Sequence, residues 1–126
     1  MPHTPVRVPG GAVMLWIQFG NIKEGRYKDF QAWTKKNEGL LEKHAPPGWA
    51  YRGTFGTVLG FGRYNVAVMM ECNKYGDFDA LREHRDETWD RLNEEATDFF
   101  LPGEAEAMLL REVGDVKVLE PKKPKK

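Results

Sequence analysis

The sequence predicts one α+β domain whose elements follow the order β-α-β-β-α-β. Three observations lead to this prediction. Two long segments carry apolar residues at spacings of three and four, as amphipathic helices do. Four shorter segments are rich in β-branched and aromatic residues, as strands are. Clusters of proline and glycine separate these segments, and a chain of 126 residues has the size of a single domain.

The first strand is expected at residues 12–19, an apolar run that ends at the turn-like pair Gly20-Asn21. The first helix follows at about residues 23–43. Its buried stripe consists of Tyr27, Phe30, Trp33, Leu40, Leu41 and His44. Pro46-Pro47-Gly48 ends this helix, because proline cannot continue helical hydrogen bonding.

The second and third strands are expected at residues 49–55 and 63–72. Glycines in the intervening segment mark a loop, so these two strands should form an antiparallel hairpin. The second helix should run without a break over about residues 77–100, closed by Pro102-Gly103. The fourth strand is expected at residues 107–113, with a possible extension through 116–118.

Both helices would then cover one face of a four-stranded antiparallel sheet, which is the ferredoxin-like arrangement. The other face needs a cover if it is apolar. Alternation assigns each strand residue to one of the two faces. The residues expected to face the helices are Val13, Leu15, Ile17, Phe19, Tyr64, Val66, Val68 and Met70. The residues expected on the uncovered face are Met14, Trp16, Gln18, Asn65, Ala67, Met69 and Glu71.

A two-residue turn at Gly60-Phe61 would place Arg52 and Thr54 on the uncovered face as well, with Arg52 near Glu71. A bulge would reverse this phase. The candidate ligand-binding residues are Trp16, Gln18, Thr54, Asn65, Met69 and Arg111. The candidate catalytic residues are Arg52 and Glu71, since an arginine can orient an anionic or phenolic ligand and a carboxylate can accept a proton. The alternative is that these two residues form a cross-strand pair at a dimer interface.

The element order, the Pro-Pro-Gly-Trp segment at 46–49 and the mixed second sheet face resemble the dimeric α/β-barrel superfamily. That group includes antibiotic-biosynthesis monooxygenases, muconolactone-isomerase-like proteins, haem-degrading monooxygenases, and NIPSNAP and EthD-like proteins. The resemblance covers roughly residues 12 to 118. It implies a homodimer in which two sheets pack face to face and enclose a pocket in each protomer. One fold can host unrelated activities, so the resemblance does not select a reaction.

The chain lacks the residues that several classes of chemistry require. The chain has no serine, which excludes a serine hydrolase, and its glycines do not form a P-loop. The single cysteine, Cys72, has no evident base beside it and is expected to be inert. His84 and Glu87 lie one turn apart without a second pair, so no metal site is expected. The haem-degrading relatives use a helix histidine where this chain has Asp90. No cofactor is therefore expected.

The charge balance and the two chain ends limit which partners are expected. The sequence has 19 basic and 19 acidic residues, so nothing draws the folded domain to nucleic acid or to an anionic membrane. Residues 1–11 are expected to form a flexible arm, and residues 119–126 a disordered basic tail around a domain at 12–118. No signal peptide or apolar run of spanning length is evident, which favours a cytoplasmic location.

These observations lead to two hypotheses of different classes. The first is a homodimeric barrel that binds a small organic molecule, in one version as a cofactor-free monooxygenase or isomerase. The second is a non-catalytic interaction module whose barrel is filled by Met14, Trp16 and Met69. A third, a nucleic-acid binder using its sheet face, requires basic and aromatic residues together on that face. A ligand pocket separates the first hypothesis from the second.

Overall fold

The computed structural model describes residues 13–60 and 62–116. Its elements are β1 (Met14–Ile22), α1 (Tyr27–Lys43), β2 (Ala50–Gly56), β3 (Val66–Cys72), α2 (Asp77–Glu83), α3 (Glu87–Phe99), β4 (Phe100–Leu110) and the short 3₁₀ helix η1 (Val113–Asp115). The sheet has the order β2-β3-β1-β4, and all neighbouring strands are antiparallel. The predicted ferredoxin-like fold class is therefore confirmed. The expected arm at 1–11 and tail at 119–126 lie outside the described residues.

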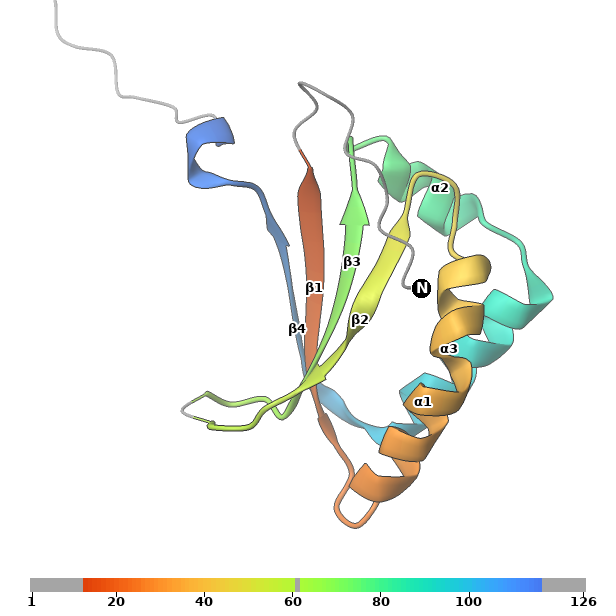
Figure 1. Ribbon diagram of the computed structural model, residues 1–126, viewed down its shortest axis with the longest axis vertical. Helices are drawn as coiled ribbons and strands as arrows, with labels where there is room; N and C mark the ends of the chain where they lie inside the picture. The colour runs from red at the N-terminus through yellow and green to blue at the C-terminus, as the bar shows by residue number, and fades with distance from the viewer. Residues whose placement is uncertain (1–12, 61, 117–126) are drawn as a thin grey trace, which may run out of the picture.

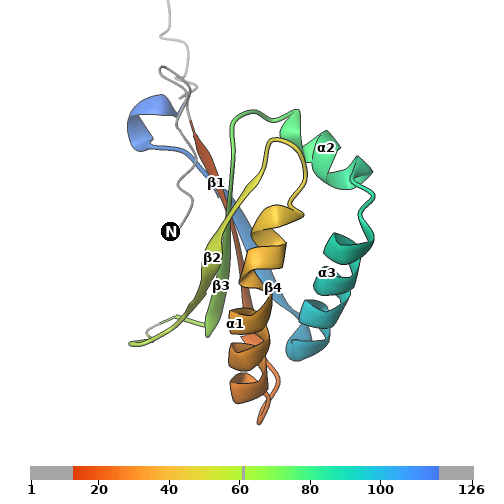
Figure 2. The same ribbon diagram turned by 45° about the vertical axis from the view of Figure 1, so that its right-hand side comes forward.

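All three α-helices lie on one side of the sheet (Figures 1 and 2). The core between these layers has two parts. The larger part joins Met14, Tyr51, Met70 and Cys72 of the sheet to Trp89 and Leu92 of α3. The smaller part lies near the start of α1 and consists of Ile22, Phe30, Val66 and Phe99. This core fixes which face of each strand turns toward the helices.

The predicted second helix is two helices, which corrects the expectation of one continuous segment. Helix α2 ends at Glu83 and α3 begins at Glu87. Between them, Asp86 adopts an extended conformation (φ −147°, ψ 117°), and its carboxylate accepts a hydrogen bond from the Trp89 backbone N–H. This is an N-cap, which satisfies an otherwise unpaired donor and starts a new helix.

Strand β4 begins at Phe100, directly after α3, and not at residue 107 as expected. Ile22 pairs with Phe100 while Gly20 pairs with Ala105, so the register shifts between these two pairs. The intervening excursion holds Pro102 and Gly103, which is tolerated because β4 is an edge strand. The Phe100 ring packs over Gly20, where an added Cβ would come within 2.6 Å of it. Glycine at position 20 therefore allows β1 to continue under this ring instead of turning.

The pairing of β1 with β3 corrects the predicted phase of β1. Met14 lies opposite Cys72, Trp16 opposite Met70, and Gln18 opposite Val68. Directly opposed residues share a face, and Val66 and Met70 of β3 lie in the core as predicted, so Met14, Trp16 and Gln18 turn toward the helices. Tyr64, expected on the helix side, precedes β3, and its ring instead lies 5.9 Å from that of Phe19. The uncovered face instead carries Leu15, Ile17 and Phe19. The prediction for β1 was therefore wrong by one residue, which exchanges its two faces.

Strand β2 carries a bulge at Arg52. Tyr51 pairs with Met70 and Gly53 with Met69, so one extra residue stands on β2. Arg52 remains on the uncovered face as predicted, whereas Thr54 lies opposite Val68 on the helix side. Gly53 takes the positive φ of 133° that this bulge requires, a conformation that glycine adopts readily.

Candidate functional site

A cavity of about 410 Å³ lies between the sheet and helices α1 and α3. Aromatic side chains dominate its wall. They include Phe30 and Trp33 of α1, Tyr51 of β2, Trp89 of α3 and Phe100 of β4. Leu41, Val68, Met70 and Leu92 add aliphatic surface. The excursion of β4 through Pro102 and Gly103 closes one side. The cavity thus lies on the face where the prediction expected solid core.

Three strand residues supply polar groups to this wall. The hydroxyls of Tyr51 and Thr54 are hydrogen-bonded to each other, across the bulge at Arg52. Burial raises the pKa of Tyr51 to about 12, so its phenol is protonated at neutral pH. Gln18 also lines the cavity, and its amide makes no side-chain hydrogen bond within residues 13–60 and 62–116. Tyr51 and Gln18 can therefore donate to an oxygen atom of a ligand.

Two further polar wall residues are already satisfied by their own helix. The Asn93 amide donates to the Trp89 carbonyl at 2.8 Å, and the Thr97 hydroxyl donates to the Asn93 carbonyl at 2.7 Å. Among the described residues that line the cavity, none carries a charge at neutral pH. Burying an unpaired charge against such a wall would cost on the order of several kcal/mol. The cavity therefore favours an uncharged occupant.

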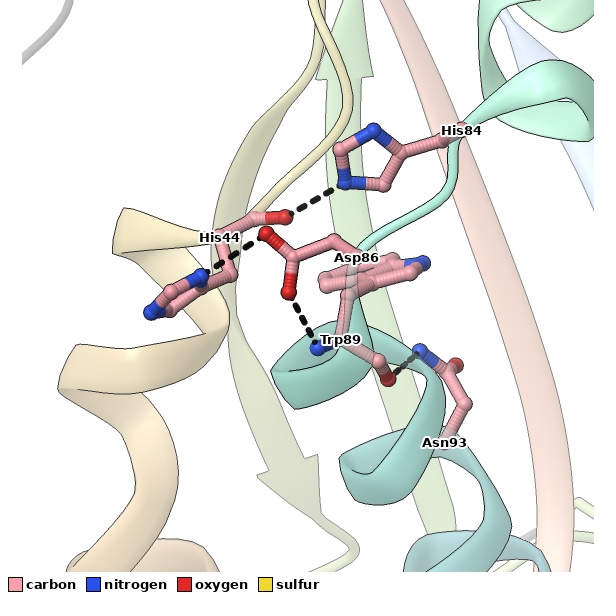
Figure 3. A network of polar contacts seen from close by, with 5 residues as sticks. All are labelled: His44, His84, Asp86, Trp89 and Asn93. Atoms are coloured by element: carbon pink, nitrogen blue, oxygen red, sulfur yellow. Dashed lines mark hydrogen bonds and ion pairs between the residues drawn. The ribbon is translucent and has the colours of Figure 1, made fainter.

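A polar network holds the end of α1 against the start of α3 (Figure 3). His44 Nδ1 lies 2.9 Å from Asp86 Oδ2, and His84 Nε2 donates to the His44 carbonyl at 2.9 Å. The Trp89 backbone N–H and the neighbouring His44 hold the pKa of Asp86 below its usual range. His44 closes α1 as its C-cap, in agreement with the predicted helix-terminal position. Because Trp89 lines the cavity, this network fixes one of its walls.

The structure separates the predicted site residues into two groups. Gln18 and Thr54 line the cavity, although on the helix side of the sheet and not on the uncovered side. Trp16 lies in the core with its ring edge-to-face against Phe78, at a centroid distance of 5.3 Å. Trp16 therefore packs beside the cavity wall and does not line it. The site prediction missed Tyr51, Trp33 and Trp89. Their positions in the apolar pattern of the sequence are the same as those of core residues, so the pattern did not mark them as cavity residues.

The remaining predicted residues lie away from the cavity. As expected, Arg52 Nη2 is 2.6 Å from Glu71 Oε2 and the pair lies on the uncovered face, which is not the face that holds the cavity. Met69 is on the same face. Asn65 precedes β3, and its side chain accepts the Ile22 backbone N–H. The Arg111 guanidinium stacks over the exposed Tyr75 ring at 5.1 Å. None of these five residues lines the 410 Å³ cavity. A catalytic role for Arg52 and Glu71 and a ligand-binding role for the other three stay predictions.

The uncovered face is mainly apolar. Leu15, Ile17 and Met69 are half-buried there, while Met108 and Leu110 of β4 are 45% and 40% exposed. In the part of the chain that the structure describes, no helix crosses this face (Figure 2). An apolar surface of this kind on a sheet marks an interaction site.

Two other candidate groups are accounted for by the fold. Cys72 is 1% exposed, and burial raises the pKa of its thiol to about 11, which fits the predicted inert thiol. Within residues 13–60 and 62–116, no three His, Cys, Asp or Glu side chains gather as a metal site would require. In the same ranges, no helix is long and apolar enough to cross a bilayer.

Comparison with known proteins supports the fold. No family profile matches the chain, and no curated protein matches it either. A dimeric ferredoxin-like protein of unknown function from Thermobifida fusca YX has a TM-score of 0.63 at 15% identity, covering 87% of this chain and 99% of that one. A NIPSNAP family protein from Agrobacterium tumefaciens C58 also has a TM-score of 0.63, at 13% identity, covering 88% and 95% of the two chains.

A third structure comes from Bordetella bronchiseptica and is provisionally described as an antibiotic biosynthesis monooxygenase. Its TM-score is 0.57 at 12% identity, over 86% of this chain and 99% of that one. The descriptions of the second and third structures name groups that the sequence pattern resembles, and the first is described as ferredoxin-like and dimeric. At these identities the likeness concerns the fold and does not extend to an activity.

Proposed function

We propose that this protein binds a small, uncharged organic molecule with an aromatic body in the cavity between its sheet and helices α1 and α3. The observation that carries the proposal is the cavity itself. Its volume of about 410 Å³ lies in the range of ligand sites, roughly 300–1,000 Å³. Its wall combines many aromatic side chains with a few polar groups, which is the usual composition of such sites.

The polar groups define how the ligand is oriented. Tyr51 and Thr54 come from one strand and Gln18 from another, and all three reach the same cavity. A ligand hydroxyl or carbonyl placed among them would gain hydrogen bonds that an apolar molecule cannot make. Each such bond contributes about 1 kcal/mol. The aromatic wall supplies most of the remaining affinity by burying the body of the ligand.

Catalysis by a cofactor-free monooxygenase or isomerase would require a group that removes a proton from the ligand. The candidates Arg52 and Glu71 lie on the opposite face of the sheet. Among the described residues of the wall, Tyr51 is the titratable one, and its raised pKa keeps it protonated at neutral pH, so it can donate a hydrogen bond but is not poised to transfer a proton in either direction. We therefore propose binding as the function and assign no reaction.

We further propose that two copies pack through their uncovered sheet faces. The exposed apolar residues of β4 and the apolar residues of β1 favour this arrangement. One similar structure is described as dimeric. In such a dimer Arg52 and Glu71 would form a charged pair at the interface and not a catalytic pair. The proposal keeps the expectation of a cytoplasmic protein without a nucleic-acid or membrane partner.

Fluorescence titration with 2-naphthol tests the binding proposal, because Trp33 and Trp89 lie in the cavity wall and should report occupancy. The charged analogue 2-naphthoate should bind at least tenfold more weakly, since the wall offers it no cation. Ala96→Phe should fill the cavity and abolish binding. Ala32→Phe, on the exposed surface of α1, is the matched control.

Binding of 2-naphthol that survives Ala96→Phe, or equal binding of the naphthoate, would contradict the proposed site. Failure of 2-naphthol and related neutral aromatics to bind would favour the alternative, a non-catalytic interaction module. Thermal melts of each variant show that the fold is intact. Light scattering of the wild-type protein tests the dimer separately, so each part of the proposal has its own measurement.

A further inference from the structure

A second, smaller cavity of about 310 Å³ lies between α1 and β2. Its composition differs from that of the larger cavity. Gln31, Lys35 and Glu38 of α1 line it, so its mouth is polar and carries one charge of each sign. Tyr27, Phe30, Phe55 and Val66 also line it, so this cavity suits an arm with an apolar stem and a polar end.

The two cavities adjoin. Phe30 and Thr54 line both of them, Phe30 from α1 and Thr54 from β2. Thr54 is also the residue whose hydroxyl is bonded to Tyr51. The polar end of the larger cavity is therefore the point at which the smaller one begins.

Thr34 provides an independent observation at the smaller cavity. Its side chain lines that cavity and is 8% exposed, and its hydroxyl has no hydrogen-bond partner among the described residues. Buried hydroxyls without a partner are uncommon in folded proteins and cost free energy. A threonine in a helix has two accessible χ1 rotamers, so rotation can turn this hydroxyl toward an occupant. A ligand atom in the smaller cavity could supply the missing partner.

We propose that the two cavities are compartments of one binding site for an elongated, uncharged molecule. The aromatic body occupies the larger compartment, and an arm ending in an amide, carbonyl or hydroxyl reaches past Thr54 to the Thr34 hydroxyl. This inference rests on the proposed binding function and adds the class of ligand. It also makes Thr34 a specificity-determining residue.

Two probes that share a 2-naphthyl ether and a four-carbon arm test the inference. They are 2-butoxynaphthalene, whose arm is apolar, and 4-(2-naphthyloxy)butanamide, whose arm ends in an amide. The wild-type protein should bind the amide about five- to tenfold more tightly than the butyl ether, as expected for one added hydrogen bond to a buried group. Thr34→Val removes the hydroxyl at almost constant volume and should abolish this preference. Thr88→Val changes a half-buried threonine that lines neither cavity and should retain it.

Equal binding of the two probes by the wild-type protein would overturn the inference, as would a preference that survives Thr34→Val. Failure of 2-naphthol itself to bind would overturn the proposed function instead. The two failures are therefore distinguishable. Thermal melts of Thr34→Val confirm that the variant is folded before its affinities are compared.

Discussion

The face assignment of β1 can be tested with two adjacent residues. Trp16 turns toward the helices and packs edge-to-face against Phe78, whereas Ile17 turns to the uncovered face and pairs with Met69. Removing a fully buried tryptophan costs about 3–5 kcal/mol. Trp16 is half-buried, so Trp16→Ala should lower the free energy of unfolding by about 2 kcal/mol. For a chain of this length, that corresponds to a fall in melting temperature of about 8 °C.

Ile17→Asp places a charge on the uncovered face and should act on association instead. Denaturant unfolding at several protein concentrations, with light scattering at each, separates the two effects. Trp16→Ala should lower the unfolding midpoint and leave the mass unchanged, and Ile17→Asp should give a monomer. If Trp16→Ala dissociates the protein while its unfolding midpoint is unchanged, the assignment of Trp16 to the helix side is refuted.

Three further predictions concern single sites. The Cys72 thiol has a pKa of about 11, so in the folded protein at pH 8 it should react with an aromatic disulfide reagent about 100-fold more slowly than in the denatured protein. Equal rates in the two states would contradict its burial. Because the pKa of Asp86 is lowered in the folded state, its charge stabilises the protein above pH ~4, and this contribution is lost as the pH falls below that value. Asp86→Asn keeps a capping side chain, so its deficit in unfolding free energy against wild type should shrink between pH 6 and pH 3, and a constant deficit would argue against the shift. Gly48→Ala should lower the free energy of unfolding by about 2 kcal/mol, since φ is +85° and the added Cβ would lie 2.5 Å from Asp77 Oδ1. Gly39→Ala, in open space on α1, should raise it by about 0.5–1 kcal/mol. Thermal melts in which both changes have the same sign would refute this contrast.

The element order and fold class could be predicted because each element carries a local signal. The break before α3 has such a signal too, since Asp86 is a capping residue followed by a new apolar stripe. The apolar residues of α3 continue the three- and four-residue spacing of those in α2, so the break between the two helices was not recognised. The boundaries of β4 could not be predicted, because Pro102-Gly103 ends most strands and is accommodated here only by the edge position.

The candidate site was predicted less well for two physical reasons. Both faces of β1 are apolar, so alternation separates the faces without saying which one meets the helices. The pairing of Met14 with Cys72 decides this, and it is a long-range contact. The bulge at Arg52 then reverses the phase of Thr54 relative to Arg52. Cavity-lining residues such as Trp33 share their composition with core residues, so a gap between them leaves no trace in the sequence.

The bulge in β2 and the excursion in β4 have a consequence for assembly. These are the two edge strands of the sheet, and each has its hydrogen-bonding ladder interrupted, at Arg52 in β2 and around Pro102 in β4. An uninterrupted edge would offer a template on which another strand could add, and repeated addition would give an open-ended polymer. Interrupted edges oppose such growth. They leave the apolar face as the favoured route of self-association, and contact through a face is satisfied once a single copy has covered it, so assembly by this route stops at a finite size.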